Sequence, residues 1–178
     1  MSRQRLDNAM SNRSSRLVEV DRPAEQVATS DPTRQQDIDQ LVRRCPKLDV
    51  AVHVGSGARR NCLALTFAEV WAFEHDLDRF MDSLSFGKRP NTYLVLAMLG
   101  DRRGIVTYPR DHERVASVPM LRIDDLNLEA LDAVVIDDPA SRDAVIAGAA
   151  QTLRKFDPIV LIGRSQNQIA KAETCLLR

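Results

Sequence analysis

The hydrophobic and polar positions of this chain alternate between two patterns. Continuously apolar runs predict buried strands, and they span 48–54, 69–74, 93–99, 104–109, 118–123, 132–137 and 158–163. Apolar residues at helical spacing predict helices over 30–45, 58–67, 76–90 and 141–156, with a short helix or turn over 124–131. Strands separated by helices predict an α/β domain with a mostly parallel sheet and helices on both faces.

Two of the predicted helices have clear boundary signals. In the first, Asp31 is placed to cap the helix and Pro32 occupies the first helical position. In the last, Ser141 can act as the cap, while Val145 and Leu153 step along one side. These signals predict one uninterrupted helix over 141–156.

The first 30 residues differ from the rest of the chain. They are polar, follow no sustained period and contain no aromatic residue, since the first aromatic residue is Phe67. Such a segment cannot bury enough apolar surface to offset the entropy lost on ordering it. We therefore predict a polar N-terminal arm at 1–30, ordered only by a partner chain, and an α/β domain at 31–178.

Charge and composition narrow the classes of function. Lys and Arg together number 25, as do Asp and Glu, so clustered positive charge for nucleic acid is not expected. No apolar run approaches the roughly 20 residues that span a bilayer, and the start lacks the apolar core of a signal peptide. A cytosolic protein follows. Cys45, Cys62 and Cys175 lack CxxC spacing, so we expect reduced packing residues and no metal site.

The turn after the first predicted strand is the candidate ligand site. In an open α/β sheet, ligands bind beyond the carboxyl ends of the strands where the strand order reverses. Gly55 lies in this turn, where glycine lets the backbone approach a ligand and the following helix N-terminus favours negative charge. Glu74 closes the second strand about 20 residues later, the position of an acid that commonly binds ribose hydroxyls.

Five stretches occur in an order that resembles a known family. They are LDVAVHVGSGARR, VWAFEHDLDRF, LAMLGDRRGIV, LRIDDLNLEALDAVVID and AVIAGAAQTLRKFDPIVLI, over roughly 48–163. Together they resemble FkbM-type S-adenosylmethionine-dependent methyltransferases, which typically show D-x-G-x-x-x-G, A-F-E-P, A-L-G-D-x-x-G, a D-D pair and I-D-x-E-G-x-E. The resemblance implies a Rossmann-like methyltransferase sheet, S-adenosylmethionine as cofactor and O-methylation of sugars or small molecules.

The resemblance also implies a set of cofactor-binding residues. These are Asp49, Gly55, Glu74, Asp101 and Asp137. Asp124 and Asp125 match the D-D pair, and Gly100 precedes Asp101 in the G-D pair. No catalytic residue is assigned, because His53 is either a general base or an ordinary residue of the first motif. His75 and His112 lie in polar turns beside acids, where surface histidines are common.

Several positions depart from the family pattern. Ala51 stands where the first motif has glycine, and Pro139, Ala140 and Arg142 replace Glu, Gly and Glu in the later one. The segment 166–178 has apolar residues near helical spacing. It predicts an amphipathic helix in place of the family's last strand pair, which would leave one sheet edge bare for another chain.

Two hypotheses of function follow from these observations. The first is a catalytically silent methyltransferase-like domain that serves as a binding or assembly subunit of a viral or other multisubunit particle. Its arm and C-terminal helix would engage partner chains. The second is an active FkbM-like O-methyltransferase with S-adenosylmethionine at the residues given above. The eroded motifs favour the first, and the retained Gly55 and Glu74 favour the second.

Overall fold

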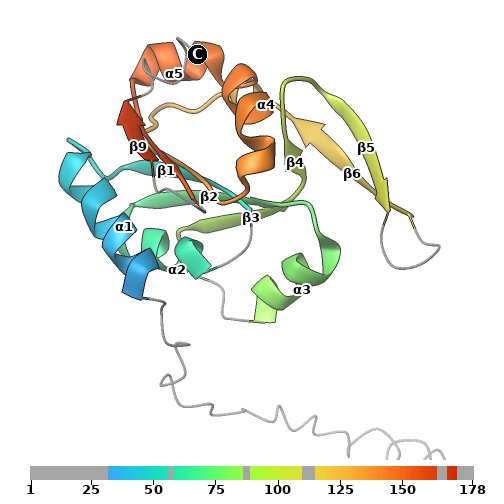
Figure 1. Ribbon diagram of the computed structural model, residues 1–178, viewed down its shortest axis with the longest axis horizontal. Helices are drawn as coiled ribbons and strands as arrows, with labels where there is room; N and C mark the ends of the chain where they lie inside the picture. Colours follow the sequence, from blue (N-terminus) through green and yellow to red (C-terminus); the bar gives the residue numbers. More distant parts are fainter. Residues whose placement is uncertain (1–31, 56–57, 86–88, 110–114, 164–167, 172–178) are drawn as a thin grey trace, which may run out of the picture.

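A six-stranded sheet forms the centre of the structure, a computed structural model that describes residues 32–55, 58–85, 89–109, 115–163 and 168–171 (Figure 1). Its strands are β1 (Val50–Val54), β2 (Glu69–Glu74), β3 (Thr92–Leu96), β7 (Ala133–Ile136), β8 (Ile159–Ile162) and β9 (Gln168–Lys171). Their order is β3-β2-β1-β7-β8-β9, parallel except for β9. The predicted Rossmann-like α/β fold is confirmed.

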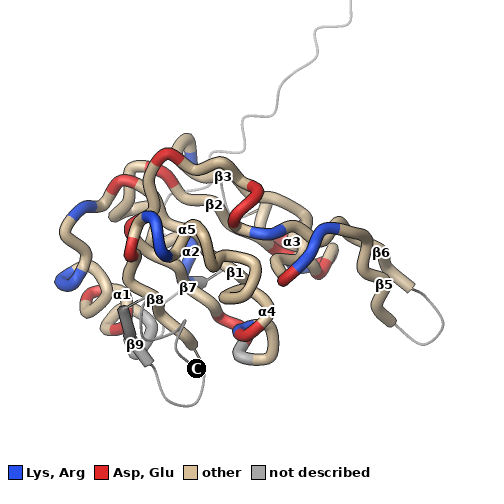
Figure 2. Tube along the Cα trace, turned by 90° about the horizontal axis from the view of Figure 1, so that it is seen from above, with Lys and Arg blue, Asp and Glu red and all other residues tan. Residues whose placement is uncertain are grey.

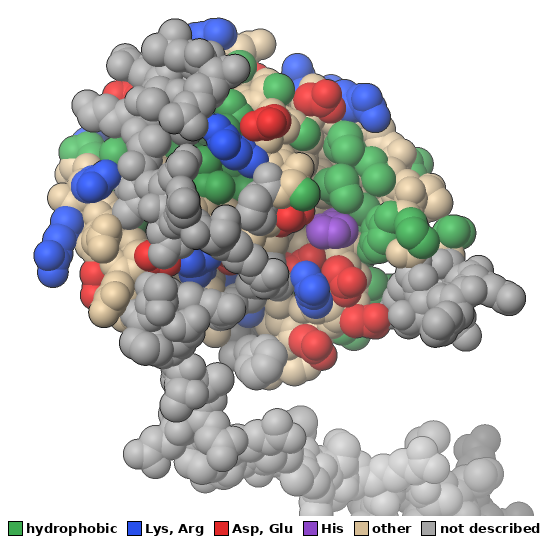
Figure 3. Space-filling model, viewed as in Figure 1, with side chains coloured by type: hydrophobic (Ala, Val, Ile, Leu, Met, Phe, Trp, Pro, Cys, Tyr) green, Lys and Arg blue, Asp and Glu red, His purple; other side chains and the backbone are tan. Residues whose placement is uncertain are grey.

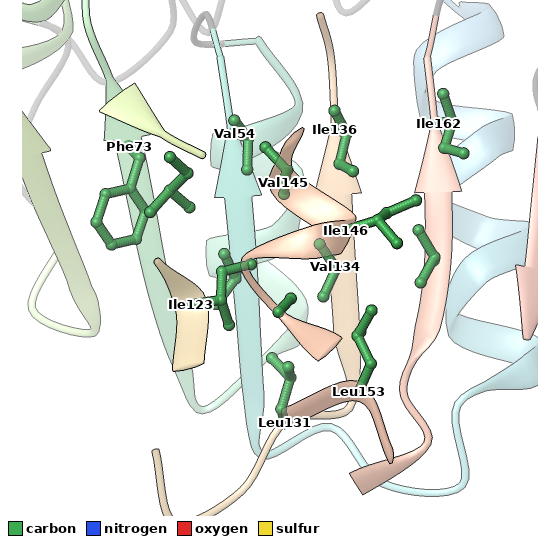
Figure 4. Packing of buried hydrophobic residues seen from close by; sticks show 14 of the residues in the cluster. Val54, Phe73, Ile123, Leu131, Val134, Ile136, Val145, Ile146, Leu153 and Ile162 are labelled. Atoms are coloured by element: carbon green, nitrogen blue, oxygen red, sulfur yellow. The ribbon is translucent and has the colours of Figure 1, made fainter. Parts of the chain in front are cut away.

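Helices cover both faces of this sheet, and the core has two halves. Helices α1 (Pro32–Arg44) and α2 (Ala58–Thr66) lie on one face, and α4 (Arg142–Ala147) and α5 (Ala150–Phe156) lie on the other (Figure 1). Figure 4 shows the second half, in which side chains from α4 and α5 pack onto β1, β7 and β8. The strand residues alternate between the two halves: Val52 and Val134 face α4 and α5, whereas Ala51 and Val135 face α1 and α2.

A smaller sheet projects from the body. It has the order β4-β6-β5, with β4 (Met98–Leu99), β5 (Gly104–Pro109) and β6 (Val115–Leu121). The run predicted as one strand over 93–99 is therefore divided, because Ala97 separates β3 from β4 and its N–H donates to the Glu74 carbonyl at 3.1 Å. Between β2 and β3 lies α3 (Leu77–Ser85). A 3-10 turn, η2 (Ile123–Asp125), coincides with only the start of the segment 124–131 predicted as a short helix or turn.

The helix predicted over 141–156 is interrupted at Gly148. A Cβ built on Gly148 would lie 1.8 Å from the carbonyl oxygen of Gly100, so only glycine allows this approach. Asp124 then caps the second piece, since its carboxylate accepts hydrogen bonds from the main-chain N–H groups of Gln151 at 3.2 Å and Thr152 at 2.8 Å. At this interruption, α4 and α5 contact the turn η2 and the end of β4.

The C-terminal prediction is wrong for the described residues 168–171, which form the strand β9 in place of a helix. This strand pairs antiparallel with β8, placing Ile169 opposite Leu161. Pairing with a buried strand outweighs the helical spacing of a short segment, a common tertiary override. That edge of β8 is therefore covered by the chain itself, and no C-terminal helix is present there for a partner.

Charged residues are mixed along the described chain, where Lys and Arg alternate with Asp and Glu (Figure 2). None of the described helices is both long enough and apolar enough to cross a membrane. The part of the chain that the structure describes also contains no group of three or more His, Cys, Asp or Glu side chains that could hold a metal ion. The arm at 1–30, Asp31, His112 and Cys175 lie outside the described residues.

Candidate functional site

The carboxyl ends of β1, β2 and β7 meet where the strand order reverses, the position at which such sheets bind ligands. Gly55 directly follows β1 with φ 107°, a left-handed conformation that favours glycine. Its N–H donates to the Phe73 carbonyl at 2.9 Å, and a Cβ built there would lie 3.2 Å from Cβ of Asp137. The turn after β1 therefore lies in close contact with Asp137, the residue that follows β7.

A buried charged network, defined here as His53, Asp137, Arg59 and Asp37, fills the α1 and α2 side of this strand edge. His53 Nε2 lies 2.9 Å from Asp137 Oδ2, and Arg59 Nη1 donates to Asp137 Oδ1. Arg59 Nη2 donates to Asp37 Oδ2 at 2.6 Å, and the four side chains are between 0 and 12 % exposed. Both oxygens of Asp137 therefore have partners from the chain itself.

The network also sets the ionisation of its members. Burial alone would raise the pKa of Asp137, but the hydrogen bond from His53 and the charge of Arg59 outweigh it and lower that pKa. Burial works to lower the pKa of Arg59, and the two carboxylates more than offset it, so the pKa of this guanidinium is raised. Because an ionised carboxylate only accepts hydrogen bonds, Nε2 of His53 carries the hydrogen. Its Nδ1 has no partner among the described residues.

A lowered pKa at Asp137 predicts a specific pH dependence of stability. The stabilisation from its pairs is complete above the ordinary carboxyl pKa of about 4 and is lost as the pH falls through the lowered value. The free energy of unfolding of Asp137→Asn should therefore lie well below that of the wild type near neutral pH. The difference should narrow below about pH 4. Urea unfolding at a series of pH values measures it, and a difference that stays constant down to pH 3 would contradict the assignment.

Glu74 is the second buried acid at this edge. It ends β2, is 2 % exposed, and accepts a hydrogen bond from the main-chain N–H of Asp76 at 2.9 Å through Oε1. Its other oxygen, Oε2, is buried without a hydrogen-bond partner among the described residues. Arg60 lies near Glu74. Burial lowers the pKa of the Arg60 guanidinium, and the negative charge of Glu74 partly offsets this lowering. A buried acceptor without a donor is costly, so a ligand or water on Glu74 Oε2 would relieve that cost.

The structure brings together Gly55, Glu74 and Asp137, but it does not bring Asp49 and Asp101 to them. Asp49 precedes β1, and its main-chain N–H donates to the Asp132 carboxylate at 2.8 Å. It thus lies at the amino end of the strand, about 20 Å from Gly55 at 3.3 Å per residue. Asp101 is exposed, and its Cα lies beside Gly148 at the junction of α4 and α5.

Ala51, which matches the glycine of the first motif, does not lie in the ligand turn. Ala51 lies inside β1, where it is fully buried and pairs with Val70 and Ala133. Its methyl group packs in the core against α1 and α2, four residues before Gly55. This methyl group therefore lies in the core and does not face the ligand turn.

Other motif residues stabilise the fold. Asp124 caps α5 as described, and Asp125 accepts paired hydrogen bonds from Arg103 and Arg122. Hydrogen bonding to these two guanidinium groups strongly lowers the pKa of Asp125. Beyond β7, the short turn η3 (Pro139–Ser141) folds onto Asp138, whose carboxylate accepts a hydrogen bond from the main-chain N–H of Ala140 at 3.0 Å.

Sequence reasoning missed Arg59 and Asp37. Each is a charged residue in a helix that packs on the sheet, and Asp37 directly precedes Ile38 on the buried face of α1. A charge inside an apolar face signals a buried pair. The partner could not be identified, because Arg59 and Asp137 are 78 residues apart in the chain.

Comparisons with known proteins give likenesses of structure. No family model matches the chain, and no curated protein matches it. A methyltransferase FkbM from Methylobacillus flagellatus KT superposes with a TM-score of 0.45 and 15% identity over 65% of this chain and 32% of that one. A chain from the complex of the Haloferax volcanii Trm112 methyltransferase activator with a putative methyltransferase gives 0.44 and 11% over 74% and 52%. This chain thus spans about a third and about half of the matched chains.

Proposed function

We propose that this chain is a non-catalytic methyltransferase-like domain that acts as a binding or assembly subunit of a viral or other multisubunit particle. The observation that carries the proposal is the pairing of the Asp137 carboxylate. Its two oxygens are bound by His53 and Arg59, so the acid after β7 is used to hold the domain together. A partner chain that binds the arm at 1–30 is part of the same proposal.

The position of the turn adds support. With Gly55 at the end of β1, the pattern D-x-G-x-x-x-G corresponds to residues 53–59. His53 then replaces the acid and Arg59 replaces the last glycine. These two replacements are the residues that bind Asp137. His53 and Arg59 each bind one oxygen of the Asp137 carboxylate, which favours a structural role for this edge of the sheet.

The described residues do not fit S-adenosylmethionine as a set. Glu74 Oε2 is a free buried acceptor suited to a ribose hydroxyl. At the end of β7 each oxygen of the Asp137 carboxylate already accepts a hydrogen bond from the chain, and Asp49 and Asp101 lie elsewhere. A cofactor needs several convergent contacts to be held in position for transfer, and one acceptor does not supply them.

A second candidate function rests on Glu74 alone. Its unpartnered oxygen would be explained if an FkbM-like O-methyltransferase bound S-adenosylmethionine over β1 and transferred its methyl group to a sugar or small-molecule hydroxyl. Gly55, Glu74 and Asp137 would then surround the cofactor.

Titration calorimetry with S-adenosylmethionine separates the two functions. We expect no saturable heat from the wild type, and no methyl transfer to sugar hydroxyls when the methyl group is radiolabelled. Micromolar binding that is lost in Glu74→Ala and kept in Asp82→Ala, an exposed acid on α3, would contradict the proposal and support the methyltransferase.

A further inference from the structure

The β5–β6 hairpin exposes an apolar face to solvent. Along both strands, alternate residues point away from the body, and each of them is exposed: Ile105, Thr107, Pro109, Val115, Ser117 and Pro119. Ile105 is 77 % exposed and Val115 is 71 % exposed. Figure 3 shows hydrophobic side chains gathered on this side of the molecule, and neither strand carries a charged residue (Figure 2). An uncharged and largely apolar face of this kind is a candidate protein interaction surface.

The opposite side of the hairpin accounts for its position but leaves this face uncovered. Val118 is buried, and the Tyr108 hydroxyl donates to the His75 carbonyl, so the inner residues fix the hairpin to the end of β2. The Tyr108 and His75 rings also meet edge to face, with centroids 5.5 Å apart. The hairpin is therefore anchored through one side, and its other side is presented outward in a fixed orientation.

The outward face has a pattern that is symmetric about its centre. Ile105 pairs with Pro119 at one end, and Pro109 pairs with Val115 at the other. Between them lies Thr107 opposite Ser117, with their hydroxyl oxygens 2.9 Å apart. A twofold axis through this central pair would place the apolar end of one hairpin on the apolar end of another. It would oppose no like charges.

We propose that this face is a homodimer interface, in which the β5–β6 hairpins of two copies of this chain pack face to face about a twofold axis. The proposal rests on the assembly role proposed above, and it identifies the surface through which two copies of the chain associate. Twofold interfaces use the same patch on both subunits, so a self-complementary patch suits a second copy of the chain. Sheet faces that pack in this way lie about 10 Å apart.

The size of the face sets the strength expected. Two strands of this length cover on the order of 200 Å², against roughly 800 Å² per partner in a stable interface. We therefore expect a weak dimer whose population rises with protein concentration.

Sedimentation velocity over a concentration series tests the interface. The wild type should move from monomer toward dimer as its concentration rises. Ile105→Lys and Val115→Lys should each weaken association by at least about tenfold, because each places two charges in the apolar contact. Leu65→Lys is the matched control, since Leu65 is 70 % exposed but lies on α2; it should associate like the wild type. Circular dichroism melting establishes that each variant is folded.

A cysteine at the centre of the face gives a second readout that does not depend on weakening the dimer. Thr107→Cys residues of two copies would lie near the twofold axis and should form a disulfide-linked dimer on oxidation. Leu65→Cys and the wild type supply the background from the native cysteines. A wild type that stays monomeric, lysine variants that associate like Leu65→Lys, or Thr107→Cys that cross-links no more than Leu65→Cys would each overturn the interface. Calorimetry with S-adenosylmethionine would still decide the proposed function independently.

Discussion

Replacing Arg59 with alanine is expected to lower the free energy of unfolding by about 3–5 kcal/mol. The Arg59 and Asp37 side chains are buried, that of Asp137 is 12 % exposed, and the Arg59 guanidinium bridges the two carboxylates. Its removal leaves two carboxylates in a poorly solvated environment without a counter-charge, which costs more than the pair itself contributes. Urea unfolding at neutral pH measures the change.

Two further variants make this result specific. Arg59→Lys should restore only part of the lost free energy of unfolding. The planar guanidinium of arginine can bind two carboxylates at once, and the compact ammonium group of lysine cannot. Arg103→Ala removes a guanidinium that binds Asp125 at the surface, and it should change the stability little. A loss for Arg59→Ala no larger than that for Arg103→Ala would mean that water reaches the network and that Asp137 is not committed to it.

Replacing Gly148 with alanine is expected to cost about 3 kcal/mol, for a steric reason. The new methyl group would lie 1.8 Å from the Gly100 carbonyl oxygen, a backbone atom that cannot rotate away. Either α4 or the end of β4 must shift, and the capping of α5 by Asp124 would be strained with it.

Gly100→Ala is the matched control for Gly148→Ala. Its Cβ would meet the Met120 sulfur at 3.0 Å. A methionine side chain is flexible and can adjust, so the expected loss is about 1 kcal/mol. Urea unfolding of both variants gives the comparison. Equal losses would show that the contact between Gly148 and Gly100 relaxes easily and does not determine the interruption of the helix.

Much of the fold could be predicted from the sequence because its signals are local. The apolar runs of β1, β7 and β8 and the helical spacing of α1 are properties of short segments, and each is observed. The break at Gly148 depends on the close approach of Gly100, 48 residues earlier. The strand β9 depends on pairing with β8. Neither contact can be predicted from the local pattern of apolar and polar residues.

The candidate site was predicted less completely for the same reason. Gly55 and Glu74 follow from their places at the ends of successive strands, whereas Asp137 follows only from the family resemblance. The family pattern, aligned with Asp49 and Ala51, does not fix which residues follow the strand, and β1 runs to Val54, so both residues lie before the turn. Arg59 and Asp37 act through contacts across the domain that no spacing in the chain encodes.

We propose that the chain's own side chains occupy the carboxyl edge of β1 and β7 in place of a cofactor. The decisive experiment is a crystal structure grown in excess S-adenosylmethionine. We predict Arg59 bridging Asp37 and Asp137, His53 on the other oxygen of Asp137, and no adenosyl density over Gly55. Density for the cofactor above β1, with its ribose on Glu74 and Arg59 displaced from Asp137, would contradict the account.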